Sequence, residues 1–275
     1  MSVINTNVSA LYSQNAMKTN ARAMSTAMEQ LSTGTRVNSA KDDAAGLAIG
    51  QNMTSQIRGL NQAVRNVNDA INMMQTAEGA MVEQSNMLQR MRELAVQAMN
   101  GTYSDVQRGY LDKEFQQLTQ QIGGIASDTM WNDQPLLMGT GGVEGTFTYQ
   151  AGQAEGQTIS VTISAMTSDN LNITGSDIAT LTNATGTLTV ISDALEKINN
   201  QRATIGAGIN RMAYAADNLT NISSNQTQSR STIMDTDYAL ATTQLAKTQI
   251  IQQAATAMLA QANQQPQAVM ALLKG

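Results

Sequence analysis

A seven-residue repeat of apolar residues constrains the fold of this chain more than any other feature of its sequence. The repeat runs without a break through Met53, Leu60, Val67, Met74, Met81, Leu88 and Ala95. A second seam follows the same period from Ile57 and becomes polar at Glu78, Ser85 and Arg92. This 3-4 spacing is typical of a long supercoiled helix. A further apolar stripe, from Met73 to Leu94, indicates a second helical neighbour and therefore a bundle.

Similar spacing before and after this segment predicts further helices. The N-terminal stripe precedes Gly34, which suits the left-handed residue after a helix; its members are Met17, Ala21, Met24, Met28 and Leu31. Ser104 and Gln107 form a capping box, and a third helix follows with the face Leu111, Phe115, Leu118, Ile122 and Ile125. Heptads resume at Ile191, Ile198, Ile205, Met212 and Leu219. The last helix, from about Asp237, has Ile251, Met258, Leu259 and Ala262 on its apolar side.

The amino-acid composition changes over residues 139–186, where glycine and threonine become frequent. Ile159, Val161 and Ile163 alternate with polar residues, and this period of two predicts strands joined by turns. The predicted fold is therefore mainly α: a rod-like coiled-coil bundle of long helices with a small β-hairpin segment, in which the N- and C-terminal helices pair. We expect a terminal-helix domain of residues 1–44 and 235–275, and a core domain of residues 45–234.

The missing residue types exclude much chemistry. The chain has no histidine and no cysteine, which removes His-dependent catalysis, thiolate nucleophiles, disulfides and the usual zinc ligands. Its net charge of -5 disfavours nucleic acid as a partner. No apolar run is long enough for a membrane span, and residues 1–16 lack the pattern of a Sec-type signal peptide. We expect no enzymatic activity, no metal, no cofactor and no membrane partner.

Several short motifs have simple structural interpretations. Asp42-Asp43 is interpreted as a helix cap and not as a cation site. The glycine-rich run 139–142 lacks the spacing of a phosphate-binding loop and is interpreted as a turn. The methionines occupy heptad positions and are interpreted as core. Residues 89–94 combine two cations with an acid on one helix, which indicates local i,i+3 pairing at a surface or an interface.

Four long motifs carry a resemblance to bacterial flagellins. Residues 31–46, LSTGTRVNSAKDDAAG, are similar to the family's N-terminal signature, and residues 89–102 are similar to its second signature. RSTIMDTDY, at 230–238, and LAQANQQPQ, at 259–267, resemble motifs of its C-terminal half. The resemblance covers roughly residues 1–138 and 190–275.

This resemblance implies a function for each region. Terminal helices of flagellins pair around the central channel of the flagellar filament, and the long helices outside them form a rod. The chain would be a self-assembling structural subunit for motility, secreted through the flagellar type III route to the extracellular filament. Its partners would be copies of itself, an export chaperone, a cap protein and hook-associated junction proteins. The assembly core would be Met53, Leu60, Val67, Met74, Met81 and Leu88.

The resemblance also implies two surfaces for innate immune recognition. Residues 29–50 resemble the peptide sensed by a plant receptor kinase, and the residues carried over are Ser32, Gly34, Arg36, Asn38, Lys41, Asp42 and Asp43. The surface for a Toll-like receptor, shared with the contact between protofilaments, comprises Gln89, Arg90, Arg92, Leu94 and Glu114.

Two other functions compete with the filament subunit. A hook–filament junction protein has related paired ends, but the motif at 263–267 favours a flagellin. An enzyme with a metallopeptidase insert would need an H-E-x-x-H helix, which a chain without histidine does not have.

Overall fold

The computed structural model describes the backbone of residues 6–273 and the side chains of residues 6–264. The chain divides into two compact units, one made of both ends (residues 1–57 and 224–275) and one made of the middle (residues 58–223). The sequence motifs at 259–267 and 263–267 extend beyond the described side chains.

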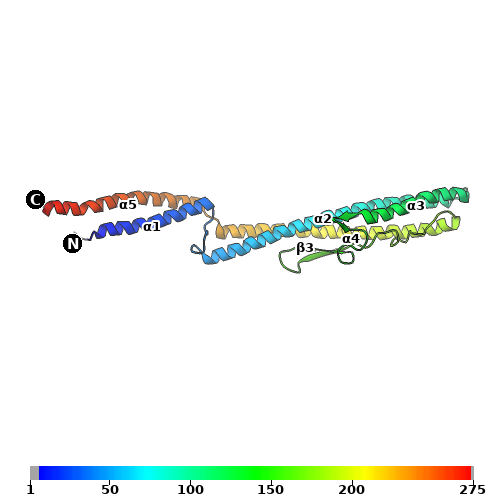
Figure 1. Ribbon diagram of the computed structural model, residues 1–275, viewed down its shortest axis with the longest axis horizontal. Helices are drawn as coiled ribbons and strands as arrows, with labels where there is room; N and C mark the ends of the chain where they lie inside the picture. The colour runs from blue at the N-terminus through cyan, green and yellow to red at the C-terminus, as the bar shows by residue number, and fades with distance from the viewer. Residues whose placement is uncertain (1–5, 274–275) are drawn as a thin grey trace. The chain divides into compact units, whose positions relative to one another are not determined.

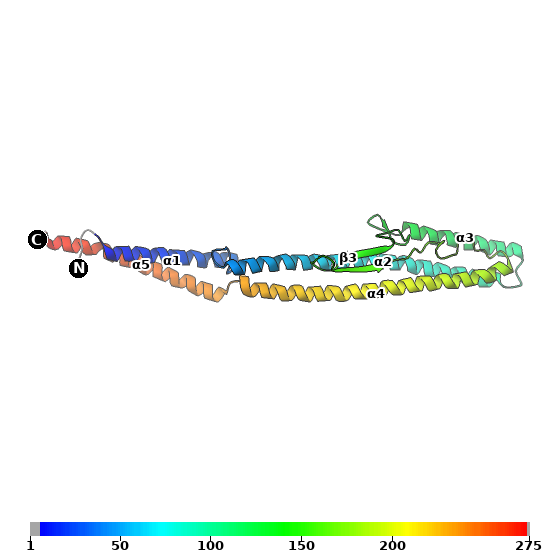
Figure 2. The same ribbon diagram turned by 90° about the horizontal axis from the view of Figure 1, so that it is seen from below.

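The terminal unit consists of the helices α1 (Val8–Thr33) and α5 (Tyr238–Leu273), with the adjoining ends of α2 and α4. The helices α1 and α5 lie side by side, as predicted (Figures 1 and 2). The helix α1 ends as the sequence predicts: Gly34 has φ 72° and its N–H donates to the Gln30 carbonyl. Asn7 caps the N-terminus of α1, because its Oδ1 accepts a hydrogen bond from the Ala10 N–H. The Nδ2 of the same side chain donates to the Ala262 carbonyl of α5 at 2.7 Å.

The contact between α1 and α5 uses only part of the predicted stripes: Met17, Met24 and Leu31 of α1 and Leu259 of α5 are half-buried, and Ala262 is buried. The predicted stripe included Ala21 and Met28, but both are exposed, whereas Ala10, Asn20 and Ala27 are the buried residues of α1. On α5, Ala241, Thr248 and Ala262 are buried at heptad-like spacing, while Ile251 and Met258 face outward. Small residues allow the two backbones to approach closely, and Asn20 Nδ2 bridges them by donating to the Thr248 carbonyl (2.7 Å) and to Gln252 Oε1 (3.2 Å). A buried asparagine of this kind fixes the register of a coiled coil.

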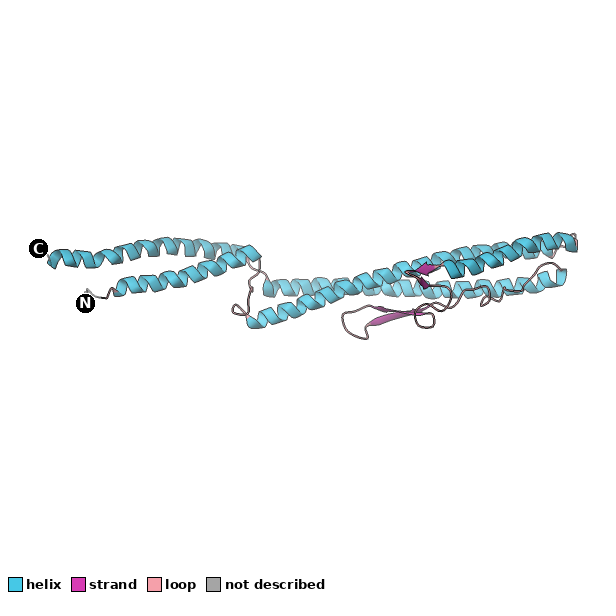
Figure 3. Cartoon of the chain, viewed as in Figure 1, coloured by secondary structure: helices cyan, strands magenta, loops and turns pink. Residues whose placement is uncertain are grey.

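The middle unit is built on two long helices, α2 (Ala44–Ala98) and α4 (Leu181–Met234), together with α3 (Asp105–Asp128) (Figures 1 and 3). The seam predicted on α4 is buried throughout, from Ile191 to Leu219. On α2, Leu60, Val67, Met74, Met81 and Leu88 are buried, and Met53, in the terminal unit, is half-buried. The polar position Glu78 lies beside Arg202 of α4, with 3.7 Å between Oε1 and Nη2.

The β region consists of two short antiparallel hairpins. The hairpin of β3 (Thr146–Gln150) and β4 (Thr158–Thr162) alternates buried and exposed residues along β4, as predicted. It packs on α4 at Gly208, where a Cβ would lie 3.0 Å from Val161 Cγ2.

Two boundaries of the β region differ from the expected 139–186. The hairpin of β1 (Met130–Trp131) and β2 (Gln134–Pro135) begins earlier, and α4 begins at Leu181. Asn132 and Asp133 both have positive φ in the turn between β1 and β2, which is the geometry of a type I′ hairpin. The Asn-Asp pair was the available signal for this turn in the sequence.

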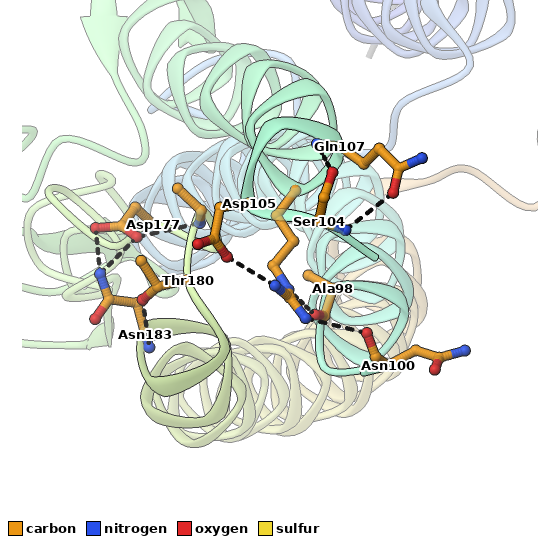
Figure 4. A network of polar contacts seen from close by, with 10 residues as sticks. Ala98, Asn100, Ser104, Asp105, Gln107, Asp177, Thr180 and Asn183 are labelled. Atoms are coloured by element: carbon orange, nitrogen blue, oxygen red, sulfur yellow. Dashed lines mark hydrogen bonds and ion pairs between the residues drawn. The ribbon is translucent and has the colours of Figure 1, made fainter. Parts of the chain in front are cut away.

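Polar side chains close the end of the middle unit where α2 turns into α3 and α4 begins (Figure 4). Ser104 and Gln107 form the predicted capping box. Arg108 is buried, and its guanidinium donates to the Ala98 carbonyl (2.7 Å), the Asn100 carbonyl (3.2 Å) and Asp105 Oδ1 (2.8 Å). The bond to Ala98 satisfies a carbonyl that the end of α2 leaves without a helical partner. Nearby, Asp177 accepts from Asn183 at the start of α4.

Candidate assembly and recognition surfaces

The residues expected to form one recognition surface on α2 lie in three different environments. Positions two apart on a helix differ by about 200° around its axis, so Arg90 and Arg92 cannot share a face. Arg90 points to α3, Gln89 and Arg92 line a groove toward α4, and Leu94 is buried. With an exposed fraction of 1%, Leu94 packs in the core, so the expectation that it is a surface contact is wrong for this fold.

Arg90 forms the centre of an exposed charge cluster. Its Nε donates to Glu114 Oε1 of α3 and its Nη1 to Glu93 Oε2 of its own helix, each at 2.9 Å. The hydrogen bond with Glu114 is the main reason that the pKa of Arg90 is raised. The structure thus brings together Arg90 and Glu114, which the resemblance had placed on one surface, and confirms the predicted i,i+3 pair with Glu93.

The linker between α1 and α2 is tied to the linker between α4 and α5. The backbone N–H of Arg36 donates to the Met234 carbonyl, and its guanidinium donates to the Ile233 carbonyl, both at 2.6 Å. Thr236 N–H donates back to the Gly34 carbonyl at 3.0 Å. These bonds join segments that are about two hundred residues apart in the sequence.

The remaining residues of the plant-type epitope shape this linker or are exposed on it. Asp43 caps α2 by accepting from the Gly46 N–H at 2.9 Å, and Asp42 accepts from the N–H and hydroxyl of Ser39. The hydroxyl of Ser39 is the main cause of the lowered pKa of Asp42. Asn38 donates to the Thr35 carbonyl. Ser32 and Lys41 are exposed. The interpretation of Asp42-Asp43 as a helix cap is confirmed for Asp43, whereas Asp42 stabilises the turn before α2.

The terminal unit presents large apolar side chains to the outside. On α5, Leu240, Ile250 and Met258 are 71%, 67% and 64% exposed, and on α1 the exposed apolar residues are Val8, Leu11, Tyr12 and Met28. The fully buried residues of the two helices are small or polar, while several larger apolar side chains stay exposed. Exposed apolar patches of this kind mark association sites.

Among the described residues, no group of three acidic, cysteine or histidine side chains is placed to hold a metal ion. No helix in that part of the chain is long and apolar enough to cross a membrane. The glycine-rich run 139–142 forms a turn with positive φ at Gly139 and Gly142, as interpreted from the sequence.

Long helices with uncovered apolar faces define a class of protein, the helical subunit that associates with copies of itself. Family models narrow this class: the bacterial flagellin N-terminal helical region matches residues 4–141, and the C-terminal helical region matches residues 188–273. The chain therefore belongs to the bacterial flagellin family, whose members are structural subunits of the flagellar filament.

Individual proteins agree with this assignment. A flagellin of Halalkalibacterium halodurans is 42% identical over 274 residues, covering 99% of this chain and 100% of that protein. The crystal structure of Bacillus cereus flagellin, 33% identical, covers 56% of this chain and 88% of its own with a TM-score of 0.51. A putative flagellar hook-associated protein from Vibrio parahaemolyticus shares the fold with a TM-score of 0.59 over 70% of this chain and 99% of its own, but is 16% identical.

Proposed function

We propose that this chain leaves the cell unfolded through the flagellar type III apparatus and polymerises outside it into the filament that drives swimming. One observation supports the polymer most directly: the pair α1–α5 buries small residues and leaves Leu240, Ile250 and Met258 exposed. Each fully covered apolar side chain of this size contributes about 1.5–3 kcal/mol. Neighbouring copies would supply that cover.

The two regions would have different positions in the filament. Residues 1–44 with 235–275 would form its inner wall, and residues 45–234 the layer outside it. The export chaperone, the cap protein and the hook-associated junction proteins would be transient partners that cover the same exposed faces of α1 and α5 before or during assembly. This follows from the family, and the exposed apolar residues give these partners a surface to bind.

The purified chain offers a direct test of the polymer. Electron microscopy after seeding with short filament fragments should reveal long helical filaments. Rings, short stubs or persistent monomers would favour the hook–filament junction protein instead. For that alternative the likeness to the hook-associated protein supplies only a shared fold, whereas the family models and the 42% identical relative are flagellins.

We also propose that free subunits are ligands of innate immune receptors. For the Toll-like receptor, the exposed Arg90–Glu114 pair supplies a preformed arrangement of charges, with Gln89 and Arg92 on the adjacent face. For the plant receptor kinase, the relevant segment is held by the bonds of Arg36 to Ile233 and Met234. A peptide of residues 29–50 should therefore signal more strongly than the folded chain.

A further inference from the structure

A groove in the middle unit runs between α2 and α4. It encloses about 700 Å³ and is lined on the α2 side by Ser85, Gln89 and Arg92. On the α4 side its lining includes Leu195, Glu196 and Arg202. Polar and apolar groups both line the groove: guanidinium groups and amides surround the half-buried side chain of Leu195.

Two guanidinium groups in this groove have donors that the chain does not use. Arg202 Nε is buried and has no hydrogen-bond partner among the described residues, although Nη2 lies 3.7 Å from Glu78. Arg92 makes no hydrogen bond or ion pair within the described part of the chain. Glu78 and Glu196 roughly balance the charge of the two cations, but the exposed N–H donors of Arg92 have no acceptor within the described part of the chain. A carboxylate from outside would give these donors a charge-assisted hydrogen bond.

A tight turn in the same unit carries a suitable carboxylate. Val143 and Thr146 exchange backbone hydrogen bonds of 3.0 and 2.9 Å, and the central residues Glu144 and Gly145 have φ of 50° and 80°. Positive φ at both central residues is the geometry of a type I′ turn. Val143 is 77% exposed, and the Glu144 side chain has no partner among the described residues.

We propose that the Val143–Glu144 turn of one copy enters the α2–α4 groove of a second copy. The Glu144 carboxylate accepts hydrogen bonds from Arg202 and Arg92, and Val143 packs on Leu195. This contact rests on the proposed function, because it joins subunits of the polymer. Since the turn and the groove are different surfaces of one chain, the contact is heterologous, and its repetition gives an open assembly and not a closed dimer.

Cross-linking tests the contact directly, because the chain has no cysteine of its own. Filaments of the double variant Val143→Cys/Ser192→Cys, which keeps Glu144 and Arg202, are treated with a short bismaleimide and separated under denaturing conditions; Val143 adjoins Glu144 and Ser192 lines the groove. The expected result is a ladder of covalent dimers, trimers and longer chains from filaments, with monomers alone from dilute subunits. The matched control, Glu155→Cys/Ser192→Cys, places the first thiol in a different exposed turn and should give no ladder.

Charge reversal supplies a second readout. Glu144→Arg and Arg202→Glu should each raise the critical concentration for polymerisation about tenfold or more, and combining them should restore most of the loss. Glu155→Arg should change little, and thermal unfolding of each variant checks that the monomer still folds. Absence of the ladder, single reversals that assemble like the wild type, or a double reversal without recovery would each overturn the contact. A wild-type chain that forms no filament would contradict the proposed function itself.

Discussion

At the scale of single residues, the buried polar side chains of this molecule mostly bind backbone carbonyls of other segments. Asn20 joins α1 to α5, Gln201 donates to the Thr162 carbonyl at the end of β4, and Gln84 donates to the carbonyls of Ile122 and Met166. Each of them fixes one segment against another at a defined position. Apolar packing alone would allow neighbouring registers, so these amides add specificity to the fold.

Arg108 should be the most sensitive of these polar residues to substitution. Arg108→Met keeps much of the apolar volume but leaves the Ala98 carbonyl without its side-chain donor and removes the charge-assisted bonds to Asn100 and Asp105. Hydrogen bonds to a charged group contribute about 1.5–3 kcal/mol each, so we expect a loss of a few kcal/mol in the free energy of unfolding. Urea unfolding followed by circular dichroism measures this. Arg58→Met, on the exposed face of α2, is the control and should change the midpoint very little.

Arg90→Ala tests whether assembly and receptor recognition use the same surface. The substitution removes two charge-assisted hydrogen bonds, to Glu114 and Glu93. Because these bonds are exposed, we expect the stability of the monomer to change by less than about 1 kcal/mol. Receptor signalling by the free subunit should fall, and the critical concentration for polymerisation should rise in the same variant. Signalling that falls while sedimentable filament stays at the wild-type level would separate the two functions.

At the scale of elements, the size of the side chains in a helix contact decides whether that contact can be predicted from the sequence. The seams of α2 and α4 were predicted correctly because large apolar residues occupy them, from Leu60 to Leu88 and from Ile191 to Leu219. The contact of α1 with α5 was predicted only in part: Met17, Met24 and Ala262 are half-buried or buried, but Asn20, Ala27 and Thr248 were missed. Hydrophobic patterning does not find contact positions that small or polar residues occupy.

The residues of the candidate recognition surface and of the α2–α4 groove could also be predicted only in part. Arg90 and Glu114 were placed by resemblance, and the structure brings them together. The burial of Leu94 follows from its heptad-like spacing with Met73 and Met87 in the second apolar stripe, which the sequence already contained. Arg202 and Glu144 were not singled out, because neither an orphaned Nε nor a positive φ has a signature in a single sequence.

Leu60→Asp tests the α2 seam at this scale. Leu60 is buried, and an aspartate there would be a charge without a partner in the core. Such a group costs several kcal/mol, which corresponds to a fall of roughly 10 °C or more in the melting temperature of a domain of this size. Asn68→Asp adds the same charge at an exposed position of the same helix and should melt like the wild type. Equal melting temperatures for both variants would mean that the seam is wrongly assigned.

At the scale of the whole molecule, the two units should respond differently to truncation. The core cluster of the middle unit, which includes Val67, Met81 and Ile198, draws its members from residues 60–219. Removing about forty residues from either end should therefore abolish polymerisation but leave the helical circular dichroism of the remaining α2, α3 and α4 intact. Collapse of the helical signal after trimming either end would show that the units do not fold independently.

The hydrogen bonds between the two linkers have a consequence for the tolerance of insertions. Closing a flexible loop costs entropy that grows with its length, by about 0.6 kcal/mol for each doubling. The side chains of Thr54 in α2 and Arg230 in α4 are hydrogen-bonded to each other. When α1 then pairs with α5, the chain that has to be ordered is therefore only the two short linkers around Arg36 and Thr236, and not the whole sequence between the two helices. The length of the segment between α3 and α4 does not enter that cost. Extra residues, or an entire folded domain, inserted at the exposed turn of residues 153–157 should leave the pairing of the two ends unchanged.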